Sequence, residues 1–138
     1  MKKKGLYYVN RHSCFLLQYH LVLVTKYRHP VMVGDIRNRV LFLSSEYFQN
    51  WTFPILEQEV CDDHLHVLFE ASPNINLSNF VNGLKTYISR KVRQEFPIEL
   101  AKFYWKPYFW SDSYFIASVS ERSTEAVKHY IATQDIAP

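Results

Sequence analysis

Two pairs of residues have the types and spacing needed for phosphoryl-transfer chemistry. His64 and His66 flank Leu65, and in a β-strand this spacing points both imidazoles to the same face of the sheet, where they can bind a divalent metal. Tyr130 and Gln134 are four residues apart, so in a helix they lie one turn apart on one face. They offer a phenol nucleophile and an amide oxygen. Together the pairs predict metal-assisted attack of a tyrosine on a phosphodiester, which is DNA strand cleavage through a covalent protein–DNA bond.

Each pair also has a purely structural interpretation. His-x-His in a strand is also compatible with a solvent-facing or hydrogen-bonded structural pair. Tyr130 is one of ten tyrosines and could simply pack its helix. Gln134 falls within the apolar stripe of that helix, where a buried amide needs a polar partner, or it is exposed near the chain end. The other histidines have no partner of this kind in the sequence, and we expect surface or core positions for His12, His20, His29 and His129.

A basic cluster predicts contacts to nucleic acid. The net charge is only +3, so affinity for phosphates must come from a local patch. One predicted helix carries Lys85, Arg90, Lys91 and Arg93, and the end of the first predicted strand carries Lys26 and Arg28. These six residues are candidate phosphate contacts, with a solvated helix face as the alternative for the helical four.

The surrounding sequence predicts an α+β fold that positions these residues. We expect strands at 15–25, 51–60, 64–70 and 109–119 from their apolar and β-branched content. We expect a helix capped by Gly34 or Asp35, a second from Asn76 or Leu77 to Phe96, and a third over about 124–134 with Ser123 as its N-cap. This order predicts a ferredoxin-like (RRM-like) split βαβ plan: one antiparallel sheet, two backing helices and a C-terminal helix that carries Tyr130.

Composition indicates one globular domain over residues 1–138. The chain is 48% apolar, and its ten Tyr, ten Phe and three Trp can fill a core and leave some rings to stack on unpaired bases. Cys14 and Cys61 are isolated, so we expect neither a zinc ribbon nor a disulfide framework. No apolar run is long enough to span a membrane, and no signal-peptide pattern follows the N-terminal lysines. We therefore expect a cytoplasmic protein without a membrane partner.

Five segments, in order, resemble one family. Residues 19–28 contain Tyr-His-Leu-Val followed by Val-Thr-Lys-Tyr-Arg, and residues 63–68 read Asp-His-Leu-His-Val-Leu. Residues 84–91 begin with Leu-Lys and end with Ser-Arg-Lys, and residues 109–115 contain Phe-Trp-Ser and Tyr-Phe. Residues 127–134 begin with Val-Lys-His-Tyr-Ile and end with Gln134. Over essentially its whole length the chain resembles the single-tyrosine HUH transposases of the smallest bacterial and archaeal insertion sequences, the IS two-hundred and six-oh-five group.

The resemblance implies a role for each candidate residue. His64, His66 and Gln134 would be ligands of Mg²⁺ or Mn²⁺, and Tyr130 would be the nucleophile. The expected activity is recognition of hairpins at the element ends in single-stranded DNA, followed by cleavage and rejoining through a 5′-phosphotyrosine, with no nucleotide cofactor. The resemblance also implies a homodimer in which Tyr130 of one subunit serves His64 and His66 of the other. Docking of the last helix on its own chain is the alternative.

Some residues depart from the family pattern, and two other functions stay open. Asp112-Ser113 replaces an Arg-Gly pair found in many members, and the linker before the last helix, 120–123, lacks glycine. A non-catalytic single-strand binding module would have the same fold without a covalent step. A metal-dependent hydrolase would use His64 and His66 with Asp63 as its base, and would form no covalent intermediate.

Overall fold

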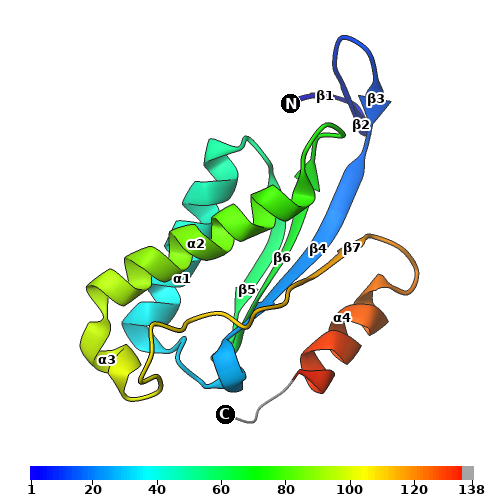
Figure 1. Cartoon of the computed structure of the whole chain (residues 1–138). Helices are drawn as coiled ribbons and strands as arrows, with labels where there is room; N and C mark the ends of the chain where they lie inside the picture. The colour runs from blue at the N-terminus through cyan, green and yellow to red at the C-terminus, as the bar shows by residue number, and fades with distance from the viewer. Residues whose placement is uncertain (135–138) are drawn as a thin grey trace.

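A four-stranded antiparallel sheet organises the computed structural model, which describes residues 1–134 (Figure 1). Its strands are β4 (Leu17–Val24), β5 (Ile55–Val60), β6 (His64–Ala71) and β7 (Phe115–Ser118), in the order β5-β6-β4-β7. Helices α1 (Gly34–Asn50) and α2 (Leu77–Glu95) cover one face, and α4 (Ser123–Thr133) lies against the other. The predicted split βαβ fold with two backing helices and a C-terminal helix is confirmed.

Alternation along β4 and β6 divides the sheet into two unlike faces. Leu21 and Leu23 of β4 and Leu65, Val67 and Phe69 of β6 are fully buried beneath α1 and α2. The intervening residues, which include His64 and His66, face the side on which α4 lies. There Val22 and Val24 form a small apolar cluster with Val127 of α4. The main core therefore covers one face of the sheet, while the other face carries the two histidines and the small apolar contact with α4.

The helix starts differ from the predicted caps. Val33, not Gly34 or Asp35, occupies the N-cap of α1. Asn76, one of the two residues at which the second helix was expected to begin, is the N-cap of α2, because its side chain accepts a hydrogen bond from the backbone N–H of Asn79. Ser123, in contrast, is the first residue of α4, and Arg122 occupies the N-cap position. The Ser123 hydroxyl instead bonds the backbone of Ser120 (2.9 Å to its oxygen, 3.2 Å from its nitrogen) and so stabilises the preceding turn. The predicted N-cap was wrong by one residue.

The N-terminal residues form a second sheet that the sequence did not predict. Strands β1 (Lys2–Lys4), β2 (Tyr7–Val9) and β3 (Cys14–Phe15) make a three-stranded antiparallel ribbon. The predicted strand at 15–25 therefore divides at Leu16 into β3 and β4. The Tyr8 hydroxyl donates to the buried carboxylate of Glu70 on β6 (2.5 Å), which ties the ribbon to the main sheet. Strands of two or three residues are too short for a detectable alternation.

Two strands are shorter in the structure than the sequence predicted. Residues 51–60 contribute only β5, because α1 ends at Asn50 and Thr52 has a positive φ of 58° in the turn that follows. Residues 109–119 contribute only β7. The segment before it crosses the end of β4, where Lys26 N–H donates to Phe109 O (2.9 Å) and Ser111 N–H to Val24 O (2.8 Å).

Two short helices complete the structure. A 3₁₀ turn, η1 (Lys26–Arg28), follows β4, and α3 (Pro97–Ala101) follows α2. Pro97 ends one helix and begins the next, as its fixed φ and missing N–H allow. None of the helices described within residues 1–134 combines the length and apolar character needed to cross a membrane.

Candidate active site

His64 begins β6 and is held by a carboxylate. Its Nδ1 lies 2.8 Å from Oδ1 of Asp63, and Oδ2 of Asp63 lies 3.2 Å from Arg28. A carboxylate accepts a hydrogen bond, so this contact places the imidazole proton on Nδ1 and leaves the Nε2 lone pair of His64 free. Both oxygens of Asp63 are engaged, which leaves this carboxylate poorly suited to be the general base of a hydrolase.

A strained turn brings Arg28 to Asp63. Tyr27 and Arg28 have positive φ values of 58° and 54°, in the left-handed region that side chains disfavour. The Thr25 hydroxyl offsets this strain, because it lies 2.8 Å from the backbone oxygen of His29 and 3.1 Å from that of Asp63. Local backbone strain of this kind is often found at functional sites.

His66 lies against His20, a contact that could not be predicted from the spacing of the histidines in the sequence. Nε2 of His66 lies 3.0 Å from Nδ1 of His20 on β4, and the two rings are nearly parallel, with a 13° angle between their planes. His20 is buried, which agrees with the surface or core position expected for it. Since His66 pairs with Val22 in the β4–β6 register, His20, two residues along, lies on the same face as a diagonal neighbour. Burial, together with the neighbouring His20, lowers the pKa of His66, which favours the neutral imidazole that metals bind.

Tyr130 and Gln134 meet at Ser113. The Tyr130 hydroxyl lies 2.8 Å from the Ser113 hydroxyl, which lies 3.4 Å from Oε1 of Gln134. The Gln134 amide donates back to the Tyr130 carbonyl at 3.1 Å. The Tyr130 ring packs on Phe115 of β7 with centroids 5.3 Å apart. Gln134 is half-buried, which rules out full exposure near the chain end.

The surroundings of Tyr130 make its phenol a poor nucleophile by itself. Burial raises the pKa of Tyr130 above its ordinary value of 10.0, and the hydrogen bond with Ser113 offsets part of this rise. At neutral pH the side chain is therefore a phenol rather than a phenolate. Attack on phosphorus requires that the proton leave as the new bond forms, or that a nearby positive charge stabilise the phenolate.

The two pairs lie on one sheet face but do not meet within one chain. Val22 of β4 pairs with His66 on β6 on one side and with Phe115 on β7 on the other. The Tyr130 ring packs on Phe115. Two strand spacings separate the backbones of His66 and Phe115 by roughly 10 Å. Among residues 1–134, the side-chain hydrogen bonds of Tyr130 and Gln134 run to Ser113 and to backbone, not to either histidine. The α4 helix packs here on β4 and β7 of its own chain.

Lys26 and Lys85 converge near the same end of the sheet. Lys26 Nζ lies 3.3 Å from Asp112, and Lys85 Nζ donates to the backbone oxygen of Ser111 at 2.8 Å. Burial lowers the pKa of Lys85, Asp112 raises it and Lys26 lowers it, with a net lowering. Together with Arg28, these lysines place three of the six predicted phosphate contacts beside the strand end from which His64 begins.

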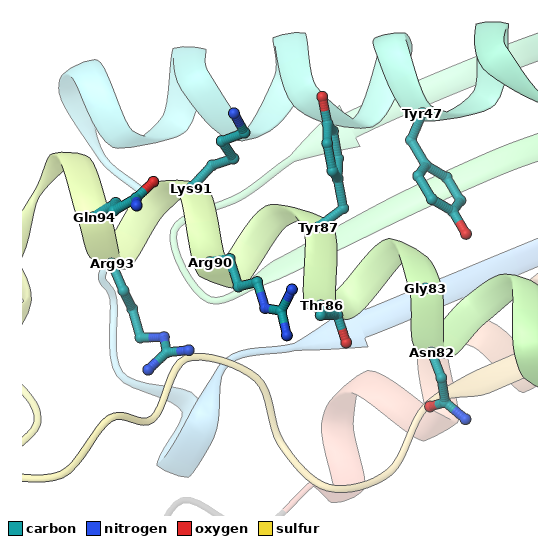
Figure 2. Close-up of a pocket in the computed structure, with 9 residues that line it drawn as sticks. All are labelled: Tyr47, Asn82, Gly83, Thr86, Tyr87, Arg90, Lys91, Arg93 and Gln94. Carbon is teal, nitrogen blue, oxygen red and sulfur yellow. The ribbon is translucent and has the colours of Figure 1, made fainter.

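The other three predicted contacts lie on the opposite side of the sheet. Arg90, Lys91 and Arg93 line a groove of about 920 Å³ along α2, as Figure 2 shows. Tyr47 of α1 and Tyr87 of α2 add aromatic surface to it. The predicted cluster of six is therefore two separate basic regions. Within residues 1–134, Nε of Arg93 is buried without a hydrogen-bond partner among the protein atoms.

The donor set suits a divalent metal only in part within one chain. Two imidazoles on one sheet face can bind a divalent metal, but Mg²⁺ and Mn²⁺ prefer oxygen ligands to nitrogen. Across the described range, residues 1–134, no group of three or more His, Cys, Asp and Glu residues has the arrangement of a metal site. A further oxygen ligand must come from outside this set, and the amide of Gln134 is chemically suitable if it is brought to the histidines.

Comparisons with known proteins identify relatives of the whole chain. The chain is 32% identical over 132 residues to the ISDra2 transposase TnpA of Deinococcus radiodurans, covering 96% of this chain and 90% of that protein. It is 30% identical over 123 residues to the transposase for insertion sequence element IS200 of Salmonella typhimurium, covering 89% of this chain and 80% of that protein.

Solved structures share the fold. A crystal structure from Deinococcus radiodurans, of a protein assigned as a transposase, superposes with a TM-score of 0.86 at 30% identity, covering 99% of this chain and all of that one. A REP-associated tyrosine transposase bound to a REP hairpin has a TM-score of 0.57 at 11% identity, covering 95% of this chain and 68% of that one, and shares the fold alone. The family model described as "Transposase IS200 like" matches residues 13–134. This chain belongs to the IS200-like transposase family.

Proposed function

We propose that this protein cleaves and rejoins single-stranded DNA with Tyr130 as the nucleophile and His64, His66 and Gln134 as the metal ligands. The observation that carries the proposal is the sheet face itself. It presents a His-x-His pair with a free imidazole nitrogen and, two strands away, a tyrosine hydroxyl linked to an amide through Ser113. Membership of the IS200-like transposase family supports the assignment.

The proposed reaction balances without a nucleotide cofactor. The Tyr130 oxygen forms a bond to phosphorus as the bond from phosphorus to the 3′ oxygen breaks. The phenol proton is lost, and the departing 3′ oxygen gains a proton. The 5′ phosphate stays on tyrosine, and a 3′ hydroxyl of another strand later reverses the same exchange. Because one phosphodiester replaces another through a phosphotyrosine, the bond energy is conserved.

A divalent ion, Mg²⁺ or Mn²⁺, would offset the charge that develops on the phosphate in the transition state. His64 would bind it through Nε2, since Asp63 holds its Nδ1 proton. Lowering of the pKa of His66 keeps that side chain neutral and able to bind. Ser113 would hold the Tyr130 hydroxyl in place and donate to the oxygen as it becomes negative.

We further propose a homodimer in which Tyr130 of one subunit serves the histidines of the other. Roughly 10 Å of sheet separates the two half-sites within one chain, so α4 must either move or be supplied by a second subunit. Because the apolar contact of α4 with its own sheet is small, centred on Val22, Val24 and Val127, release of α4 from its own chain would cost little free energy.

Two basic regions give the DNA two separate contacts in this proposal. Lys26, Arg28 and Lys85 would hold the backbone of the strand to be cut, because they lie at the end of the sheet that carries His64. The groove along α2, lined by Arg90, Lys91 and Arg93, would bind the duplex stem of a hairpin. Alanine at Arg90 and Lys91 should weaken hairpin binding and flatten its salt dependence without changing the rate of cleavage of an unstructured strand.

A denaturing gel tests the chemistry directly. The purified chain is incubated with Mg²⁺ and single-stranded DNA that carries an insertion-sequence end, labelled at either its 5′ or its 3′ terminus. The proposal expects the 3′ label to move into a protein-linked band and the 5′ label into a shorter free strand. Tyr130→Phe should abolish both products, and Tyr114→Phe is the matched control, since it removes a neighbouring phenol from the same region.

The outcomes separate the proposal from its alternatives. Cleavage without a protein-linked band would indicate a hydrolase, and retention of intact DNA at all metal concentrations would indicate a binding module. For the dimer, Tyr130→Phe and His64→Ala proteins are co-expressed and the heterodimer is purified. Recovery of about half of the wild-type activity supports shared sites, and no recovery refutes them.

A further inference from the structure

His20 is a buried histidine to which the proposed chemistry gives no role. It lies on β4 between Leu68 of β6 and Ala117 of β7 in the strand register, and its side chain is only 8% exposed. A buried imidazole needs a hydrogen-bond partner. In the part of the chain that the structure describes, the one side-chain partner of His20 is Nε2 of His66, 3.0 Å from its Nδ1.

The contact allows two arrangements of protons. In the first, Nε2–H of His66 donates to Nδ1 of His20, and the lone pair of His66 lies on Nδ1. In the second, Nδ1–H of His20 donates to Nε2 of His66, which then carries its own proton on Nδ1. The second arrangement leaves a neutral His66 with no free lone pair, because one nitrogen is protonated and the other accepts a hydrogen bond. Only the first lets His66 bind a metal while the contact persists.

We propose that His20 is a positioning residue that accepts the Nε2 proton of His66 and presents Nδ1 of His66 to the metal. This rests on the proposed function, in which His66 is a ligand. Ligating histidines almost always donate their other N–H to an acceptor that fixes the ring. Asp63 is the acceptor for His64, at 2.8 Å, and in this proposal His20 is the acceptor for His66. The two ligands therefore bind through opposite nitrogens, Nε2 of His64 and Nδ1 of His66.

The strand register makes this arrangement rigid. Val22 lies directly opposite His66, so His20 is a diagonal cross-strand neighbour whose position is set by the backbone ladder of the two central strands. The near-parallel rings bring the two nitrogens into line without bending either side chain across the sheet. A preorganised imidazole loses less conformational entropy when a metal binds.

The test uses the full chain with Mn²⁺ and no DNA. His20→Phe keeps an aromatic ring of similar size but removes the acceptor, whereas His20→Asn keeps an acceptor oxygen near the place of Nδ1. We expect the Mn²⁺ dissociation constant to rise by about 10- to 100-fold in His20→Phe and to stay close to the wild-type value in His20→Asn. Electron spin-echo spectroscopy of bound Mn²⁺ should show two imidazole nitrogens in the wild type and a lost or weakened second coupling in His20→Phe.

A second measurement needs no metal. Proton–nitrogen correlation spectra of the imidazoles should show the Nε2–H tautomer for His66 and an unprotonated Nδ1 for His20. Finding the Nδ1–H tautomer for His66, or wild-type Mn²⁺ affinity with both nitrogen couplings in His20→Phe, overturns the inference. Absence of Mn²⁺ binding by the wild type, or unchanged binding in His64→Ala and His66→Ala, would instead refute the metal site of the proposed function, and the tautomer spectra would still decide the role of His20.

Discussion

Removal of the Asp63 carboxylate tests whether the metal site depends on residues behind its ligands. Asp63 accepts from Nδ1 of His64 at 2.8 Å, and the two side chains are only 17% and 16% exposed, so water cannot easily replace this hydrogen bond. In Asp63→Ala the His64 proton is no longer held on Nδ1, and the Nε2 lone pair is available only part of the time. Loss of such a partner typically weakens metal affinity by about 10- to 100-fold, which is about 1.4 to 2.7 kcal/mol.

The assay is titration of the full chain with Mn²⁺ without DNA, followed by free Mn²⁺ in its paramagnetic resonance spectrum. Asp63→Asn should show a smaller loss, because an amide oxygen can still accept from His64 although the negative charge is gone. Asp62→Ala is the matched control, since it removes a carboxylate from the adjacent exposed residue and so measures the effect of charge alone. If Asp63→Ala binds Mn²⁺ like the wild type, or no more weakly than Asp62→Ala, the reasoning about His64 is wrong.

Three further predictions concern the nucleophile, the N-terminal ribbon and the DNA-facing loop. Ser113→Ala removes a hydrogen bond that lowers the pKa of Tyr130, so the rise of the cleavage rate with pH that reports ionisation of Tyr130 should move to higher pH. We expect single-turnover cleavage to slow by about 2- to 10-fold, the equivalent of about 0.5–1.5 kcal/mol. An unchanged pH–rate profile would contradict this. Glu70→Gln leaves Tyr8 and Gln18 without their charged acceptor and should lower the free energy of unfolding in urea by about 1–3 kcal/mol at neutral pH. Burial raises the pKa of Glu70, but hydrogen bonds from Tyr8 and Gln18 and the charge of Lys3 outweigh this effect, so the pKa of Glu70 in the folded protein lies below the ordinary 4.5. The stabilisation is therefore fully present above pH 4.5 and is lost as the pH falls through the folded pKa. A difference in unfolding free energy between the wild type and Glu70→Gln that does not shrink on acidification would contradict this prediction. Asp112→Asn frees Lys26 from its ion pair and should tighten binding of single-stranded DNA, with the log–log salt slope steeper by about 0.7; weaker binding in a filter or anisotropy assay would mean that this carboxylate does not oppose the DNA.

Features with a short period along the chain could be predicted from the sequence. Alternation in β6 places His64 and His66 on one face and Leu65, Val67 and Phe69 in the core, because side-chain direction in a strand depends on residue parity alone. The order of helices and strands followed from similar local patterns. The grouping of Tyr130 with Gln134 followed from helical spacing, although Gln134 lies at the C-cap, just past the last residue of α4.

Features that depend on strand register or on tertiary docking could not be predicted in this way. His20 meets His66, 46 residues away, only because Val22 rather than its neighbour pairs with His66, and register is set by the whole sheet. Ser113 reaches Tyr130 because the segment before β7 crosses the end of β4, where hydrogen bonds to Val24 and Lys26 replace the predicted strand. The basic residues divide between two faces because Lys85 reaches over the sheet end while Arg90, Lys91 and Arg93 follow α2 along its groove. Local sequence thus determined which side chains share a face of their own helix or strand. Packing between elements decided which of those faces meet, because voids and buried polar groups without hydrogen-bond partners are minimised over the whole molecule rather than within any one segment.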